Sequence, residues 1–320
     1  MSTEGSKRAV VAAMIANLGI AIAKFIGFLF TASSSLLAES VHSMADTGNQ
    51  VLLLFGGKRS RMAPDRKHPF GYGRERFFWA FVVSIVLFTL GAMFAIYEGI
   101  EKVMHPHKID SPQWAIGILA VSILLEANSF RTAVHEARPA KGNSSWLAFI
   151  RRSRSPELPV VILEDIGALI GLAFALCAVV IAVVTGNGVW DGVGSIVIGT
   201  LLGVIAIVLS TEMKSLLIGE SATEDDENAI RSAIDNSSVV NQLISLRTEH
   251  IGPEEILVAA KVEFDRSLTM AELADAIDDV EVTIRTAVPA ARRIFLEPDV
   301  VKPELGGEGD PWSGLEGRPH

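Results

Sequence analysis

The sequence contains very little cysteine: Cys177 is the only one among 320 residues. One cysteine forms no internal disulfide and excludes metal sites built from several cysteines. Basic residues are outnumbered, with 28 Lys and Arg against 37 Asp and Glu, so the electrostatic footprint of a nucleic-acid-binding protein is missing. No nucleophile motif, phosphate-cradling loop or dinucleotide fingerprint is present either. We therefore expect no enzyme activity, no prosthetic group and no nucleic-acid partner.

Apolar residues, by contrast, are abundant, at 49% of the chain with a mean hydropathy of +0.38. The charges are unevenly divided: residues 1–218 hold 19 basic and 15 acidic side chains, whereas residues 219–320 hold 9 and 22. Such asymmetry predicts a region embedded in the lipid bilayer followed by a region in water. The first apolar stretch lacks a small-residue cleavage site, which favours a retained span over a signal peptide.

Six apolar windows fit the length of a membrane-spanning helix, since a bilayer core of about 30 Å needs about 20 residues. They cover roughly 9–31, 35–57, 77–101, 112–134, 158–185 and 190–217. Lys and Arg gather in loops 58–76 and 138–154, and the alternate loops have few. The positive-inside rule then places these loops and both termini in the cytoplasm. Compact loops favour a bacterial inner (plasma) membrane, and the glycines of the last two windows favour close helix packing.

After Glu220 the pattern is that of a small α+β domain. Helical periodicity over 221–235 and 269–288 alternates with β-rich runs at 239–251, 254–264 and 291–299. The order α-β-β-α-β predicts a two-layer, ferredoxin-like domain over residues 219–299. Residues 300–320 are rich in Gly, Pro and Glu and are expected to be disordered. The predicted fold class is an all-α six-helix transmembrane bundle over 1–218 plus this cytoplasmic domain.

The second window carries a polar stripe of Glu39, His42, Asp46 and Asn49, spaced so that all four share one helix face. A charge at mid-membrane costs about 2.5–3.5 kcal/mol even on insertion scales, so the stripe should face a polar cavity or a partner. An imidazole and a carboxylate one turn apart can bind one divalent metal ion. Two ligands do not complete a tetrahedral site, so others must come from neighbouring helices.

The best candidates for further ligands are Glu164 and Asp165 in the fifth window, then Glu126 in the fourth. A single buried histidine is more often a hydrogen-bonding group than a ligand. A His and two acids on one stripe, facing acids in other windows, instead favour an ion pathway. Glu39 is the weaker member, because it lies nearer the outer end of the helix where water reaches it.

Several stretches together resemble the cation diffusion facilitator family of proton-coupled exporters of zinc and related divalent metals. They are SSSLLAESVHSMADTGNQVLL, the following HPFGYGRER, and six spans with an acidic α+β tail, together covering residues 8–299. LLEANSFRTAVHEARPAKGNSS and PVVILEDIGALIGL are similar to the branch containing the animal organellar zinc transporter. The resemblance implies a homodimer, cytoplasmic C-terminal domains and a tetrahedral transport site shared by spans two and five.

Carried over residue by residue, the family's ligands fall on His42, Asp46 and Asp165, while its second histidine falls on Val161. Adjacent Glu164, Glu126 or a water then supplies the fourth ligand. One histidine with three oxygens is a harder donor set than usual, so we expect Zn²⁺ to be transported with less discrimination against Mn²⁺, Fe²⁺, Co²⁺ or Cd²⁺.

Two further sites known in the family are weak or lost here. The loop site matches at Asp65 and His68, but its third position holds Tyr72. Histidines of the family's cytoplasmic metal site fall on Lys261 and Leu296, so dimer packing is the expected role of the tail. Two alternatives to metal export stay open: a proton-coupled transporter of another solute, and a non-transporting receptor or scaffold with an acidic tail.

Overall fold

The computed structural model describes residues 3–31, 34–106, 112–142, 144–153 and 155–301. Within these ranges the side chains of 3–9, 31, 34–39, 151 and 152 are outside the description. The chain divides into two compact units after Glu220, with the short segment Ile251–Glu254 assigned to the first unit. The predicted disordered tail, 300–320, lies outside the described residues from 302 onward.

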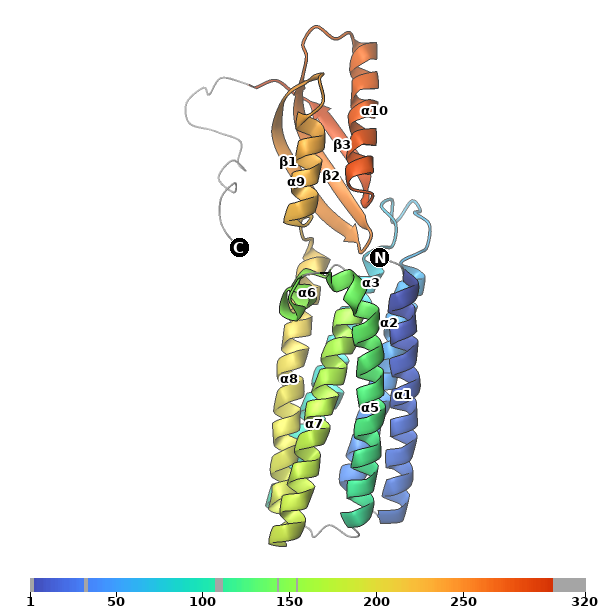
Figure 1. The fold of residues 1–320 in the computed structure, drawn as a ribbon, viewed down its shortest axis with the longest axis vertical. Coiled ribbons are helices and arrows are strands. Elements are labelled where there is room, and N and C mark those ends of the chain that lie inside the picture. Colours follow the sequence, from blue (N-terminus) through green and yellow to red (C-terminus); the bar gives the residue numbers. More distant parts are fainter. Residues whose placement is uncertain (1–2, 32–33, 107–111, 143, 154, 302–320) are drawn as a thin grey trace. The chain divides into compact units, whose positions relative to one another are not determined.

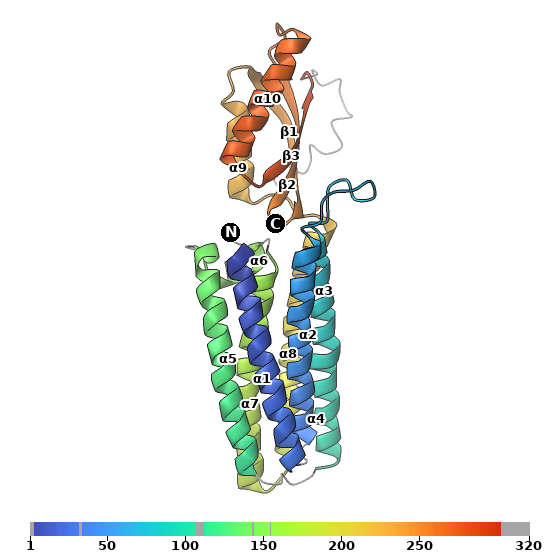
Figure 2. The ribbon, with the colours of Figure 1, turned by 90° about the vertical axis from the view of Figure 1, so that its right-hand side faces the viewer.

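The first unit is a bundle of long helices that run side by side (Figures 1 and 2). The third of them is continuous from Glu75 to Met104 and contains a π-helical segment at its middle. In chain order the elements are α1 (Thr3–Thr31), α2 (Ser34–Arg59), α3 (Glu75–Val86), η1 (Leu87–Met93), α4 (Phe94–Met104), α5 (Pro112–Lys141), α6 (Trp146–Arg152), α7 (Glu157–Thr185) and α8 (Val189–Ile218).

Five helices of the described chain are long and apolar enough to cross a membrane. They are Val10–Phe30, Glu75–Met104, Pro112–Lys141, Glu157–Thr185 and Val189–Ile218. Helix α2 has the length, at 26 residues, but lower hydropathy because its interior carries the polar stripe around His42 and Asp46. Large apolar side chains such as Phe30 and Val184 point out of the bundle, as expected of surfaces facing lipid. The protein is a multi-pass membrane protein.

The loop predicted over 138–154 is largely helical instead. Helix α5 continues to Lys141, and α6 covers Trp146–Arg152 with the Ser145 hydroxyl accepting a hydrogen bond from the Ala148 N–H. Positive charge indicated which segments avoid lipid, but it says little about conformation, because Lys and Arg are good helix formers. We call the end of the bundle that holds residues 58–76 and 138–154 the basic end.

Glycines bring α4 and α8 into backbone contact. A Cβ added at Gly192 would lie 2.7 Å from the carbonyl oxygen of Gly99, and one at Gly199 would lie 2.8 Å from the carbonyl oxygen of Ala92 in η1. Only residues without a side chain permit such an approach, and lipid supplies no hydrophobic drive for helices to associate otherwise. Close packing is therefore the role of these glycines.

The second unit is a two-layer α+β domain. Its elements are α9 (Glu224–Asp235), β1 (Val240–Gly252), β2 (Glu255–Phe264), α10 (Met270–Ala287) and β3 (Ala291–Pro298), with strand order β1-β2-β3. Strands β2 and β3 are parallel, with Val258 opposite Ile294. Ile234 of α9 and Ile284 of α10 are fully buried in one core with Val258. The predicted bundle followed by a small α-β-β-α-β domain is confirmed.

Candidate functional site

A polar cavity lies inside the bundle between α1, α2, α5, α7 and α8. Its lining residues are Lys24, His42, Ser43, Asp46, Glu126, Gly167, Ala168, Gly171, Leu172, Ile198 and Leu202. We call its five polar members, Lys24, His42, Ser43, Asp46 and Glu126, the cavity layer. The small residues of α7 leave room for them, because glycine and alanine fill little of the space between helices. The cavity thus gathers charged groups from three helices.

His42 and Asp46 form a pair on α2, with 3.5 Å between His42 Nε2 and Asp46 Oδ2. They lie four residues apart, so one helical turn brings both side chains to the same face. The other ring nitrogen, His42 Nδ1, is buried and makes no hydrogen bond within the described structure. The π-helical segment runs beside the ring, since a Cβ at Gly91 would lie 3.4 Å from His42 Cε1. The predicted span-two pair therefore faces a cavity, as the polar stripe suggested.

Lys24 and Glu126 complete the cavity layer from α1 and α5, and each is only 2% exposed. The Lys24 ammonium donates a hydrogen bond to the Ser43 hydroxyl at 3.0 Å. Glu126 was anticipated as a candidate ligand, whereas Lys24 was not. The signal for Lys24 was present, because a lone charge inside an apolar window is expensive and marks a functional position.

A second polar group lies one turn closer to the basic end, and we call it the carboxylate layer: Asn49, Gln50, Ser129, Glu164 and Asp165. Asn49 Nδ2 donates to Glu164 Oε1 at 2.9 Å, and Gln50 Nε2 donates to Glu164 Oε2 at 3.1 Å. The Ser129 hydroxyl donates to Asp165 Oδ2 at 3.0 Å. Asn49 follows Asp46 by three positions and Ser129 follows Glu126 by three, so the two layers stack along the helices.

The two layers do not meet at a single metal-binding point in this arrangement. Among the described residues no three His, Cys, Asp or Glu side chains lie close enough together to hold a metal ion. Glu164 and Asp165 are both buried, and neutral donors from α2 and α5 hold them. Val161, at the position of the family's second histidine, is fully buried in the apolar core. The sequence-predicted residues are thus divided between adjacent layers.

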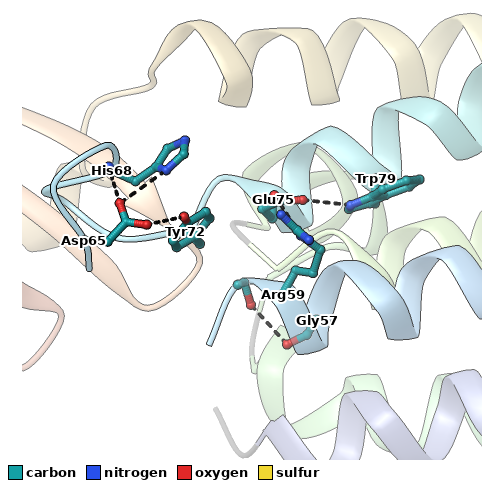
Figure 3. A network of polar contacts seen from close by, with 8 residues as sticks. Gly57, Arg59, Asp65, His68, Tyr72, Glu75 and Trp79 are labelled. Carbon is teal, nitrogen blue, oxygen red and sulfur yellow. Dashed lines mark hydrogen bonds and ion pairs between the residues drawn. The ribbon is translucent and has the colours of Figure 1, made fainter. Parts of the chain in front are cut away.

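The three remaining candidates, Glu39 and the loop residues Asp65 and His68, lie elsewhere. The side chain of Glu39 is outside the description, although its backbone is part of α2. In the loop before α3, Asp65 Oδ1 accepts hydrogen bonds from the N–H groups of Lys67 at 2.9 Å and His68 at 2.7 Å. Tyr72 donates its hydroxyl to Asp65 Oδ2 at 2.7 Å (Figure 3), and this bond is the main reason that the pKa of Asp65 is lowered. The carboxylate therefore shapes a turn, a common role for Asp.

Next to this turn, an ion pair ties the start of α3 to the end of α2. Arg59 Nε lies 3.0 Å from Glu75 Oε1, and Trp79 Nε1 donates to the other carboxylate oxygen at 2.8 Å (Figure 3). A second ion pair joins Arg76 to Glu157 at the start of α7. These contacts anchor the basic end of the bundle.

In the second unit, the described residues form no group of three or more His, Cys, Asp or Glu side chains that could hold a metal ion. Lys261, at one expected histidine position, pairs with Asp299 at 3.4 Å and with Glu297 at 3.5 Å. Its hydrogen bond to Asp299 is the main reason that the pKa of the ammonium is raised. A charged ammonium at this position opposes metal binding.

Comparison with known proteins adds independent findings. A family model described as the cation efflux transmembrane domain matches residues 10–218, which include both polar layers. The metal tolerance protein C4 of Arabidopsis thaliana is 33% identical over 84% of this chain and 60% of its own length. The human "Proton-coupled zinc antiporter SLC30A9, mitochondrial" is 31% identical over 82% of this chain and 46% of its own. The magnetosome protein MamB of Magnetospira sp. (strain QH-2) is 26% identical over 83% and 86%. This chain thus spans about half the length of the first two relatives.

Proposed function

The chain belongs to the cation efflux (cation diffusion facilitator) family, near the branch of the animal organellar zinc transporter, and from this premise we propose that it exports divalent metal ions in exchange for protons. Members of the family are transporters and not enzymes, as the sequence predicted. The observation that carries the proposal is the His42–Asp46 pair, 3.5 Å apart, facing a cavity shared with Glu126. Zn²⁺ is the proposed main cargo, because imidazole and carboxylate together suit it.

The proposed metal ligands are His42 and Asp46 from the cavity layer and Asp165 and Glu164 from the carboxylate layer. One helical turn, about 5.4 Å along the axis, separates the two layers. Ligation by all four requires Glu164 to leave the Asn49 and Gln50 amides, or Asp165 to leave the Ser129 hydroxyl. Glu126 already lines the cavity and is proposed as an additional ligand or a proton relay. Three oxygens beside one imidazole would admit Mn²⁺, Fe²⁺, Co²⁺ or Cd²⁺ more readily than a site with two imidazoles.

Proton coupling follows from the chemistry of these ligands. Metal ligands must be deprotonated, so protons and metal ions compete for the same side chains. A fall in pH therefore favours protonation of His42 and of the carboxylates over metal binding. Alternating access about a mid-membrane site then exchanges metal from one side for protons from the other.

The direction of transport is proposed from charge. The basic end belongs in the cytoplasm by the positive-inside rule, and with it both termini, so export from the cytoplasm loads the site from the carboxylate layer. The resemblance further suggests a homodimer. A bacterial inner membrane, expected from the compact loops, receives no support from relatives whose names include a mitochondrial location. We therefore propose how the chain is oriented in its membrane, and we make no proposal about which membrane it occupies.

A transport assay on the purified full chain in proteoliposomes tests the function. Metal entry is followed with a trapped metal-sensitive dye and proton counterflow with a pH dye, across Zn²⁺, Mn²⁺, Fe²⁺, Co²⁺ and Cd²⁺. We expect metal flux coupled to opposite proton flux, fastest for Zn²⁺. Proton flux that is the same with and without each metal would indicate transport of another solute. The absence of both metal flux and proton flux would indicate a receptor or scaffold.

A further inference from the structure

Lys24 places its ammonium group among the residues that line the cavity. The side chain is 2% exposed and ranks among the largest fully buried ones of the described chain. Its ammonium donates to Ser43 Oγ at 3.0 Å, and Ser43 lies directly after His42 and three residues before Asp46. A buried charge in a membrane helix is costly enough that its retention points to a role in the ion pathway.

We infer that Lys24 is a tethered cation that competes with the metal ion for the cavity, an inference that rests on the proposed metal transport. When metal is absent, the ammonium supplies positive charge beside the carboxylates of Asp46 and Glu126. When a divalent ion enters, two further positive charges come within a few ångströms of the ammonium, and like charges repel strongly in a medium of low dielectric constant. Metal binding therefore requires the ammonium to withdraw.

The consequence for transport is a weaker and more reversible metal site. The carboxylates of Asp46 and Glu126 attract a divalent ion, and the Lys24 ammonium offsets part of that attraction with a positive charge in excess of that of the metal ion. That excess lowers metal affinity and favours release on the far side of the membrane. Ser43 holds the ammonium next to the ligands rather than away from them, which keeps the competitor within reach after each release. A lysine that only linked α1 to α2 would affect folding and leave metal affinity unchanged.

Zn²⁺ affinity of the purified full chain, measured by competition with a chromophoric chelator at constant pH, tests this inference. Lys24→Met removes the charge and keeps the length of the side chain, so Zn²⁺ should bind about tenfold tighter or more. Lys24→Arg keeps the charge and should stay near wild type. Lys102→Met is the matched control. Lys102 lies on α4, pairs with Asp191 of α8 at 3.1 Å and does not line the cavity. Its Zn²⁺ affinity should equal that of wild type.

The outcomes separate this inference from the proposed function. If wild type binds no metal, the proposed function fails and the inference fails with it. If wild type binds Zn²⁺ and Lys24→Met binds it with equal or lower affinity, only the inference is overturned. Should Lys24→Met not fold, Lys24→Gln provides the same test, because its amide can still donate to Ser43 without carrying charge. Tighter binding by the neutral variant and not by Lys24→Arg supports the inference.

Discussion

Asn49 and Glu164 are joined across α2 and α7, with Asn49 Nδ2 donating to Glu164 Oε1 at 2.9 Å. Gln50 donates to the other carboxylate oxygen at 3.1 Å, so two neutral amides hold both oxygens of a buried acid. A carboxylate in this position can have two roles. It links two helices, and under the proposed function it becomes a metal ligand once an amide is released.

Substitutions at Glu164 should separate these roles. Glu164→Gln keeps the size and polarity of the side chain, so we expect a folded protein that has lost most metal flux, because an amide replaces a carboxylate poorly as a ligand. Glu164→Ala leaves the buried amide donors of Asn49 and Gln50 unsatisfied, each at a cost of about 1–3 kcal/mol. Thermal unfolding and liposome flux measure the two effects. Wild-type flux in Glu164→Gln would show that Glu164 only links helices.

Asp46→Ala should abolish metal-driven proton flux in proteoliposomes. The substitution removes one of the two groups of the His42–Asp46 pair and a charge that lines the cavity. Glu101→Ala is the control, since Glu101 is exposed and pairs with His105 at 3.0 Å at the far end of α4. Flux at the wild-type rate in Asp46→Ala would sink the assignment of the transport site.

Asp165 and Ser129 form a ligand and its support in the proposed site. Asp165→Ala should remove metal transport, whereas Ser129→Ala deletes only the hydroxyl that orients the carboxylate. Loss of such an outer hydrogen bond lowers metal affinity by about 10–100-fold. Chelator competition on both variants checks the order. An inert Asp165→Ala would overturn the contribution of α7 to the site.

Gly192→Ala should destabilise the bundle. The added Cβ would lie 2.7 Å from the carbonyl oxygen of Gly99 and 2.9 Å from the N–H nitrogen of Val103, both rigid backbone atoms. Overpacking of this kind costs about 1–3 kcal/mol. Gly117→Ala on α5 is the control, because nothing lies within 4 Å of its added Cβ and alanine favours a helix. Thermal unfolding in detergent compares them, and equal melting temperatures would contradict the packing.

Tyr72→Phe should raise the pKa of Asp65 towards its ordinary value near 3.8, because the Tyr72 hydroxyl is the main cause of its depression. The depressed pKa means that the turn gains stability from ionised Asp65 above pH 3.8 and loses it as the pH falls through the folded-state value. An NMR titration of the Asp65 carboxyl in wild type and Tyr72→Phe measures the shift. An unchanged pKa would contradict the role of the hydroxyl.

Helices and strands of this protein follow closely from local pattern. The predicted window 190–217 became α8 (Val189–Ile218), and the run 254–264 became β2 (Glu255–Phe264). The length of the apolar run determines the membrane-spanning helix, because the run must cross the lipid core. The alternation of apolar and polar residues determines the strand, because one of its faces packs against the domain core. The short helix α6 was missed, since its basic residues indicated only that the segment avoids lipid.

The pairing of His42 with Asp46 was equally accessible, since a spacing of four on one helix places both side chains on one face. Contacts between different helices could not be predicted from the sequence, because the rotation and depth of each helix depend on packing across the whole bundle. Only the tertiary structure shows that Glu126 lines the same cavity as that pair. It also shows that Glu164 accepts hydrogen bonds from Asn49 and Gln50, and that Asp165 accepts one from Ser129. Lys24 belongs to the same class: its charge is visible in the sequence, and its place in the cavity comes from the tertiary structure.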